Sequence, residues 1–543
     1  MLMEEGYAWS AAVWINDHIL ELGLTAFYSL CILTIFAVIN KRFLLKKRQE
    51  DKEKPTELPQ ESNGRKLCRI ESSVDHLHKY GGSIGAYVLL LNSKVYLNPN
   101  MVKNALVYLT NRHEILRIKI SRKKTKIQGN KKIIKEFKAM ENSDFAEFLL
   151  KLKATTSDQW LSVFERELMK QFPEEGPLWR FVMLKEQFHP KEGVYSNAFV
   201  FSAHHLVCDF ESGFNFFSDF LDYLNSSIQD SSLSKPDFDV KFPLQLSFSH
   251  LLGNCMSMSQ PLIAVTAAKV FVMKMIEKIR PKPTYKNPFT STFHPTITKN
   301  PTIQKKTCLI PRSLTKEETL NLIKLCKANK CTVYGAVSAA TTIAMATILR
   351  KGKSTAPLII TSSFQVDLRK DCNPKVEPQE LGHYSMNCSV NVPLAKDITL
   401  PLGVNDASFW LLAQECDRIF HTAITNNDHL NSMKLMTNLN INPLRNLGEL
   451  AKDQEAAGRQ ASLFHLSNLG KKSIVNSDAI NLEGFYFALA EHNIGPVFSN
   501  NIASVNGVLY WGFTYFTNVT TESQAVEYAD LVMNCIKGNS VKH

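Results

Sequence analysis

The longest apolar segment of the sequence lies near its N-terminus. "LGLTAFYSLCILTIFAVI", Leu22 to Ile39, has no charged residue, and the basic stretch "KRFLLKKR" follows at once. A helix of this length just spans the hydrocarbon core of a bilayer. The residues ahead of it include Glu and Asp but no Lys or Arg, which places the C-terminal side in the cytosol. We expect a single-pass membrane anchor with the bulk of the chain cytosolic; a buried core helix is the alternative.

The pattern changes after this segment. Residues 49–69 are charged, contain proline and are almost free of apolar positions, which predicts a linker. A helix is predicted around Asn100 to Asn111. The basic excursion "SRKKTKIQGNKKIIKEFK" follows, and a solvated strand face is a simpler interpretation of it than a cofactor or membrane contact. "PLWRFVMLKE" and "YSNAFVFSAHH" have the composition of strands.

The middle and second half continue this mixture. "SMSQPLIAVTAAKVFVMKMIEKIRPKP" is an apolar helix with a basic end, and it fits either a helix lying on the membrane or one packed between subdomains. Thr315 and Glu318 form a capping-box pattern at a helix start, and Thr332 can cap the next helix. Later stretches such as "PLIITSSFQVDLR", "ASLFHLSNL" and "GVLYWGFTYF" predict strands. Because strands and helices mix without regular alternation, we expect an α+β fold.

Composition and charge narrow the function classes. The formal net charge is +12 and the isoelectric point is near 9.0, which suits nucleic acid, an anionic membrane or a phosphorylated cofactor. No zinc-finger spacing, RNA-binding aromatic signature or basic zipper occurs, so nucleic acid is the least supported partner. The 11 cysteines are scattered without paired spacing, which indicates free thiols in a reducing compartment. Sequons at Asn225, Asn387 and Asn518 argue only weakly for a lumenal chain.

Two adjacent histidines end an apolar strand in "FVFSAHHLVCDFESGFNFFSDFL", residues 199–221. The segment behind them carries apolar residues at helical spacing, so His204 and His205 lie at a strand-to-helix junction. Asp209 stands where that helix begins, and capping the helix is its simplest role. No third and fourth ligand follow at a familiar spacing, so a zinc site is poorly supported.

The HHxxxD pattern after a strand resembles the active-site motif of the acyl-CoA-dependent acyltransferase superfamily, which includes chloramphenicol acetyltransferase, condensation domains, plant BAHD enzymes and alcohol acetyltransferases. Further stretches resemble the family in the same order, over about residues 70 to 535. They are "NRHEILRIKI", "GPLWRFVML", "CTVYGAVSAATTIAMA", "VDLRKD", "LGHYSMN" and "HLSNLG". The later ones are closest to the alcohol acetyltransferase and polyketide-associated branches. Two features depart from the family: Phe210 replaces the usual glycine, which puts substrate room in doubt, and the plant DFGWG signature is absent.

The resemblance implies a two-subdomain sandwich of the chloramphenicol acetyltransferase type. We expect an anchor and basic flank at 1–48, the linker at 49–69 and an N-terminal subdomain at 70–245. A connecting helical and basic segment at 246–305 and a C-terminal subdomain at 306–543 would follow.

The resemblance also assigns roles. It implies that His205 is the general base of a direct acyl transfer, and that Asp209 points away from the reaction and holds an arginine. Arg369 of "VDLRKD" is the candidate partner, with a surface strand position as its alternative. The oxyanion donor stays open, because a turn before Gly470 explains Ser467 and Asn468 equally well. Nothing in the sequence gives His204, His383 or His492 a separate role, so we interpret all three as structural.

The expected activity is transfer of an acyl group, such as acetyl, from acyl-CoA to the hydroxyl of a hydrophobic alcohol. Acyl-CoA is a co-substrate, and neither a resident cofactor nor a metal is expected. The anchor suggests the endoplasmic reticulum or lipid droplets. Two alternatives remain: an amide-forming condensation enzyme, and an acyl-CoA-binding homologue without turnover.

Overall fold

A computed structural model describes most of the chain outside its N-terminus and middle segment. The described residues are 64–127, 130–140, 149–173, 176–229, 240–256, 261, 265, 292–293, 305–350, 358–394, 402–438, 463–491 and 494–538. The predicted anchor and most of the middle helix lie outside these ranges, so both stay predictions.

Contacts divide the chain into two compact units. One comprises Met1–Gln60, Asn254–Tyr285 and Asn431–Ile441, of which the structure describes only short pieces. The other comprises Glu61–Gly253, Lys286–Leu430 and Asn442–His543. This second unit contains the predicted N-terminal subdomain, 70–245, and all of the predicted C-terminal subdomain, 306–543, except Asn431–Ile441.

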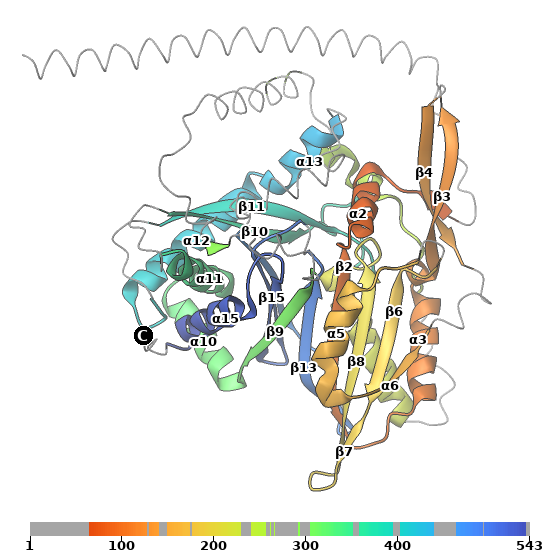
Figure 1. Cartoon of the computed structure of the whole chain (residues 1–543), viewed down its shortest axis with the longest axis horizontal. Coiled ribbons are helices and arrows are strands. Elements are labelled where there is room, and N and C mark those ends of the chain that lie inside the picture. Colours follow the sequence, from red (N-terminus) through yellow and green to blue (C-terminus); the bar gives the residue numbers. More distant parts are fainter. Residues whose placement is uncertain are drawn as a thin grey trace, which may run out of the picture. The chain divides into compact units, whose positions relative to one another are not determined.

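The first half is built on a mixed sheet (Figure 1). Its strands, in spatial order, are β13 (Ile480–Leu489), β2 (Ile84–Ser93), β8 (Val194–His204), β6 (Trp179–Lys185) and β5 (Lys151–Thr156), and β7 (Gln187–His189) pairs with β8. The associated helices are α3 (Pro99–Arg112), α5 (Trp160–Met169) and α6 (Phe210–Gln229). The helix predicted at Asn100–Asn111 is thus confirmed as α3.

Helices cover both faces of this sheet because its strands are apolar on both sides. On β13, Phe485 packs against Phe214 of α6, while its neighbour Tyr486 stacks on Trp160 of α5. Successive strand residues point to opposite faces, so α5 and α6 lie on opposite sides. The apolar residues at helical spacing in α6 therefore form a buried face that packs on the sheet. One of its contacts stacks Phe216 of α6 on Phe201 of β8, with ring centroids 3.9 Å apart.

The second half is built on a six-stranded sheet covered by helices. The strand order is β11 (Ser385–Leu394), β10 (Leu358–Asp367), β12 (Phe464–Lys472), β14 (Phe498–Val505), β15 (Val508–Phe516) and β9 (Thr307–Leu314). The helices are α10 (Lys316–Ala328), α11 (Val333–Arg350), α12 (Ala407–Thr425) and α15 (Glu522–Lys537). The capping box of Thr315 and Glu318 is confirmed at α10, and the Thr332 hydroxyl accepts a hydrogen bond from Gly335 N at α11.

Helix α11 is the one described helix that is long and apolar enough to cross a membrane. Within the described residues, 78% of its apolar window is buried inside the protein. It packs against α12 and α15, which is the behaviour of a core helix.

Strand β13 links the two halves. It belongs by sequence to the predicted C-terminal subdomain, yet it pairs antiparallel with β2 along Ile480 to Leu489. Main-chain hydrogen bonds therefore join the halves, in addition to side-chain packing.

The basic excursion forms a hairpin. Strands β3 (Ile118–Ile127) and β4 (Asn130–Ala139) pair with each other, and β1 (Gly64–Lys66) joins the edge of β4. Asp75 of α2 (Arg69–Lys79) is fully buried and pairs with Arg122 and Lys135 of the hairpin, at 2.7 and 2.5 Å. Part of the positive charge is thus neutralised inside the fold. The remaining described elements are η1 (Glu114–Arg117), η2 (Ser157–Gln159), α7 (Phe248–Leu252), η3 (Gly253–Met256) and α13 (Asp428–Asn438).

Candidate active site

His205 lies in the turn between β8 and α6. Its backbone N–H donates to Ser83 O at 2.9 Å, and its ring Nδ1 lies 3.1 Å from Cys208 O. A carbonyl oxygen only accepts, so Nδ1 carries the proton and donates it. Nε2 is left with its lone pair and can act as a base.

The protonation state of His205 follows from its surroundings. Burial lowers the pKa of His205, while the hydrogen bond to Cys208 and the charge of Asp209 raise it by less. Desolvation disfavours the imidazolium, so the ring is neutral near pH 7. A neutral imidazole with a fixed tautomer is the form that general-base catalysis requires.

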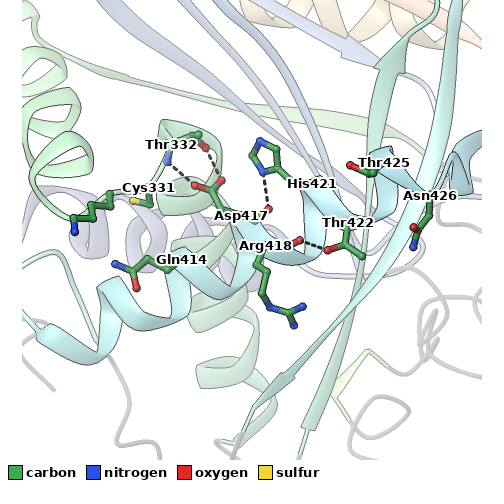
Figure 2. Close-up of a pocket in the computed structure, with 10 residues that line it drawn as sticks. Cys331, Thr332, Gln414, Asp417, Arg418, His421, Thr422, Thr425 and Asn426 are labelled. Atoms are coloured by element: carbon green, nitrogen blue, oxygen red, sulfur yellow. Dashed lines mark hydrogen bonds between the residues drawn. The ribbon is translucent and has the colours of Figure 1, made fainter.

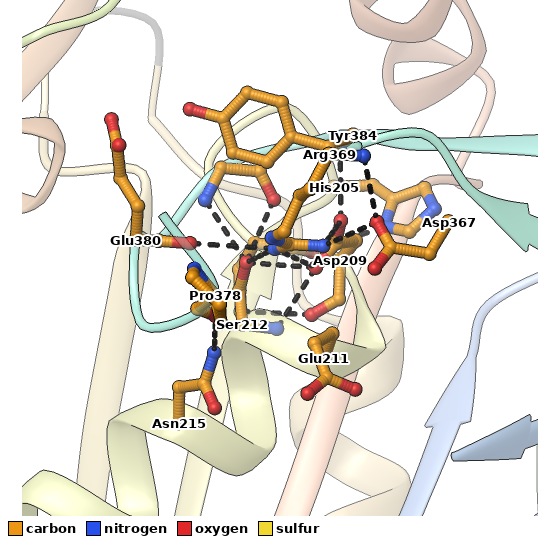
Figure 3. A network of polar contacts seen from close by, with 12 residues as sticks. His205, Asp209, Glu211, Ser212, Asn215, Asp367, Arg369, Pro378, Glu380 and Tyr384 are labelled. Atoms are coloured by element: carbon orange, nitrogen blue, oxygen red, sulfur yellow. Dashed lines mark hydrogen bonds and ion pairs between the residues drawn. The ribbon is translucent and has the colours of Figure 1, made fainter. Parts of the chain in front are cut away.

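Asp209 and Arg369 form a buried ion pair between the two halves (Figure 3). Arg369 Nη1 donates to Asp209 Oδ2 at 3.1 Å, and Nη2 donates to Oδ1 at 3.0 Å. The side chains of both residues are almost entirely buried. Two parallel hydrogen bonds fix the geometry more strictly than one charge contact would. Arg369 is therefore not a surface residue.

The Asp209 carboxylate also receives backbone donors. Ser212 N donates to it at 2.8 Å, so Asp209 caps the start of α6, and Tyr384 N donates at 3.0 Å. Burial would raise the pKa of Asp209, but the charge and hydrogen bonds of Arg369 outweigh it and lower the pKa to about 2. The helix-cap role and the ion-pair role thus coexist in one side chain.

The loop that supplies Tyr384 also brings a second histidine to His205. The ring of His383 lies edge-on to that of His205, with centroids 4.6 Å apart. Burial, followed by the repulsion that a protonated His205 would exert, lowers the pKa of His383 to about 3. His383 is therefore a neutral packing partner, and a positive charge on either ring would disfavour one on the other.

His204 belongs to a different environment from its neighbour. Its Nδ1 accepts from Leu206 N at 3.2 Å, and its ring lies 4.4 Å from that of His78. Its Nε2 is 3.9 Å from Asp75 Oδ1. Burial lowers the pKa of His204 well below its ordinary value. It joins α2 to β8 and does not line the cavity described next.

A cavity of about 290 Å³ lies between the halves, with His205 in its wall. Its lining combines the N-terminal end of α6, the ends of β10 and β12 and the end of β13. The residues are His205, Asp209, Phe210, Glu211, Gln365, Asp367, Arg369, Ser385, His465, Ser467, Asn468, Leu469, Leu489, Glu491 and Ser499. The imidazole thus borders a cavity between the two halves.

His465 is a cavity residue that the sequence analysis did not single out. It lies on β12, in register with Ser363 of β10 and Ser499 of β14. Its Nδ1 is 2.9 Å from Ser363 Oγ. Burial, and then the repulsion that a protonated His205 would exert, lowers the pKa of His465 to about 4. Two neutral imidazoles therefore face the same cavity.

The comparisons identify the chain's relatives. The family model for alcohol acetyltransferase matches residues 94–533. This chain belongs to the alcohol acetyltransferase family. The resemblance read from HHxxxD and the later stretches is confirmed at the level of the family. A search of curated protein sequences found no match.

Solved structures share the fold of this alcohol acetyltransferase family member. TRI3 trichothecene 15-O-acetyltransferase from Fusarium sporotrichioides superposes with a TM-score of 0.60 at 12% identity, covering 88% of this chain and 95% of that one. Polyketide synthase associated protein 5 from Mycobacterium tuberculosis gives 0.56 at 13% identity, covering 88% and 100%. The condensation domain of the MokA Monacolin K polyketide synthase gives 0.54 at 10%, covering 88% and 97%. The expected α+β fold of the chloramphenicol acetyltransferase and condensation-domain type is confirmed, while the N-terminal transmembrane helix predicted with it lies outside the described residues.

Phe210 is the departure from the family motif whose consequence the structure shows. It is the first residue of α6, where helical backbone suits any side chain. Its ring packs 4.6 Å from that of Phe487 and 6.1 Å from His205. The aromatic ring forms one wall of the cavity and leaves the space beside His205 open.

The stretch "SNLG" divides into two roles. Asn468 Oδ1 accepts from Gly470 N at 2.8 Å, and Gly470 has φ +70, a left-handed conformation that favours glycine. The turn explanation therefore holds for Asn468. Ser467 lies on β12 two residues after His465, on the same face, and lines the cavity.

A larger hollow of about 730 Å³ lies elsewhere, beside α12 (Figure 2). Its central carboxylate, Asp417, accepts from Thr332 N and Oγ1 at 2.5 and 2.6 Å. Asp417 thereby supports the N-terminal end of α11, which is a structural task. Within the described part of the chain, no group of three or more His, Cys, Asp and Glu could hold a metal ion.

Proposed function

We propose that the chain transfers an acyl group from acyl-CoA to the hydroxyl of a hydrophobic alcohol, with His205 as general base. The observation that carries the proposal is the position of His205: a neutral imidazole, with Nδ1 held by Cys208 O, in the wall of a cavity between the halves. Membership in the alcohol acetyltransferase family supports acyl transfer to an alcohol.

The proposed chemistry assigns one task to each group. His205 Nε2 takes the acceptor's hydroxyl proton as its oxygen attacks the thioester carbonyl. A positioned base of this kind accelerates a reaction by about 10²- to 10⁴-fold. Asp209 and Arg369 hold the turn that carries His205, because all their hydrogen bonds are made within the fold. In this proposal they position the base.

The test measures thiol release. Purified protein is incubated with acyl-CoA of graded chain length and a mixture of alcohols, and free coenzyme A thiol is titrated. We expect turnover by the wild type and its loss in His205→Ala. His421→Ala is the matched control, since His421 belongs to α12, does not line the His205 cavity, and hydrogen-bonds through Nδ1 to the carbonyl of Asp417 in the same helix. Equal release by wild type and His205→Ala overturns the proposal. Turnover with amines only would mean that the acceptor is an amine and not an alcohol. Turnover with an acyl-carrier protein only would mean that the donor is not acyl-CoA.

We also propose that Leu22–Ile39 anchors the chain in the endoplasmic reticulum or lipid-droplet membrane, with the catalytic part in the cytosol. The support is the uncharged segment followed by basic residues. A charge in mid-helix opposes insertion, so Leu33→Arg is expected to release protein from the membrane fraction. Full-length wild-type protein recovered in the soluble fraction contradicts the anchor.

A further inference from the structure

The two faces of β12 differ in chemistry. Phe464 and Leu466 point into the apolar core of the second half. His465 and Ser467, between and after them, point to the opposite face and line the cavity. Neighbouring strands continue this polar face with Ser363 and Ser499, which are in register with His465. The C-terminal half thus presents His465, Ser467 and Ser499 to the cavity that His205 faces from the N-terminal half.

The contact with Ser363 determines where the proton of His465 resides. Ser363 is buried, and within the described part of the chain its hydroxyl bonds only to His465 Nδ1. A buried hydroxyl donates its proton where an acceptor is at hand, so Ser363 donates and Nδ1 accepts. The ring proton then lies on Nε2. His465 has the tautomer opposite to that of His205, whose proton is on Nδ1.

We propose that His465 donates a hydrogen bond from Nε2–H to the thioester oxygen as that oxygen becomes an oxyanion. The proposal rests on the proposed acyl transfer and adds to it the group that stabilises the negative charge. Burial keeps the pKa of His465 at about 4, so the ring is a neutral donor and gives up no proton of its own. Ser363 fixes the donor before the reaction begins, and preorganised donors of this kind contribute strongly to catalysis.

The step balances as follows. The alcohol oxygen forms a bond to the thioester carbon, its proton passes to His205 Nε2, and the carbonyl electron pair moves onto oxygen beside His465. Collapse of this tetrahedral intermediate breaks the C–S bond. The leaving thiolate takes the proton from His205, which yields the ester and free coenzyme A thiol. His465 keeps its proton throughout.

Ser467 is the competing donor on the same strand. Within the described residues its hydroxyl has no hydrogen bond that would orient it toward the cavity it lines. Asn468 is a poorer candidate, because its side-chain oxygen is used by the turn at Gly470. His465 differs from both because its contact with Ser363 leaves a ring proton on Nε2 before substrate binds.

The experiment compares donors of similar shape. His465→Leu removes the donor, whereas His465→Gln keeps an amide N–H near the position of Nε2. We expect His465→Leu to lower kcat by about 10²- to 10³-fold with little change in KM for acyl-CoA, and His465→Gln to recover much of the loss. Equal kcat in wild type and His465→Leu overturns the proposal, and so does equal loss in the Leu and Gln variants when both fold.

A second pair keeps the test valid if His465→Leu does not fold. Ser363→Ala removes the group that holds His465, and Ser362→Ala removes its neighbour on β10, which is equally buried but points to the other face. We expect kcat to fall in Ser363→Ala and not in Ser362→Ala; equal values contradict the inference. An inactive wild type overturns the proposed function as well, whereas loss in His205→Ala with normal His465 variants overturns the His465 role alone.

Discussion

The two walls of the cavity hold the same side chain in two different ways. On the N-terminal wall, His205 donates from Nδ1 to a backbone carbonyl and presents a lone pair. On the C-terminal wall, His465 Nδ1 lies 2.9 Å from Ser363 Oγ, and in the tautomer that we propose it accepts from that hydroxyl and presents a proton at Nε2. Burial keeps both rings neutral. The hydrogen-bond partner of Nδ1 therefore decides whether a buried imidazole presents a lone pair at Nε2 and acts as a base, or presents a proton there and acts as a donor.

The walls also differ in what holds them. The His205 turn depends on a buried ion pair and the backbone donors around Asp209. His465 lies in the middle of a hydrogen-bonded sheet, between β10 and β14. Substitutions in the charge network should therefore disturb the base and spare the donor.

The largest effect is expected from Arg369→Met. It leaves the Asp209 carboxylate buried without its cation, which costs about 3–5 kcal/mol of unfolding free energy. Asp367→Asn is the matched control, because Asp367 also accepts from Arg369 at 3.0 Å but its side chain is half exposed. Denaturant unfolding measures both. If both variants lose the same free energy of unfolding, the cost does not come from leaving the Asp209 carboxylate buried without its cation.

The acid stability of the protein should depend on the same wall. The pKa of Asp209 is lowered by Arg369, from 3.8 to about 2. A carboxylate with a depressed pKa stabilises the fold above its unfolded pKa, and that stability is lost as pH falls through the window between these values. We expect Asp209→Asn to flatten the dependence of unfolding free energy on pH in this window. An unchanged dependence would mean that other carboxylates control it.

The pH profile of the reaction should report His205. Because burial lowers the pKa of His205, the base stays neutral below pH 6.5. We expect kcat/KM to hold its value as pH falls to 6.5 and to decline only at lower pH. In His465→Gln we expect kcat/KM to begin its decline at the same pH as in the wild type, while its value above that pH is lower. A decline of kcat/KM that begins above pH 6.5 would contradict the assignment of a buried, neutral His205 as the base.

The smallest effect concerns acyl length. The Phe210 ring forms one wall of the cavity beside His205, so Phe210→Ala should enlarge the space and raise the relative kcat/KM for longer acyl-CoA donors. The cost is lost packing against Phe487. A panel of donors measures the shift; an unchanged preference would place the acyl chain elsewhere.

Several features could be predicted from the sequence because their signals are local. The helical spacing behind the histidines predicts α6, and Thr315 with Glu318 predicts the start of α10. The family motifs pointed to His205, Asp209 and Arg369, whose catalytic and supporting roles stay proposals.

Other features depend on contacts between distant residues. His465 and Ser363 are 102 positions apart, and only the register of β10 against β12 brings them together. The alternation in "FHLSN" shows that two residues share a polar face, but not which cavity that face meets. The pairing of β13 with β2 and the position of His383 beside His205 likewise follow from the folded chain.

The central claim is that His205 is the base of an acyl transfer from coenzyme A. The most direct measurement is coenzyme A thiol release with an alcohol acceptor by wild type, His205→Ala and the control His421→Ala, all shown to be folded. The account predicts turnover in the wild type and the control, with a loss of about 10²- to 10⁴-fold in His205→Ala. Equal turnover in all three contradicts it.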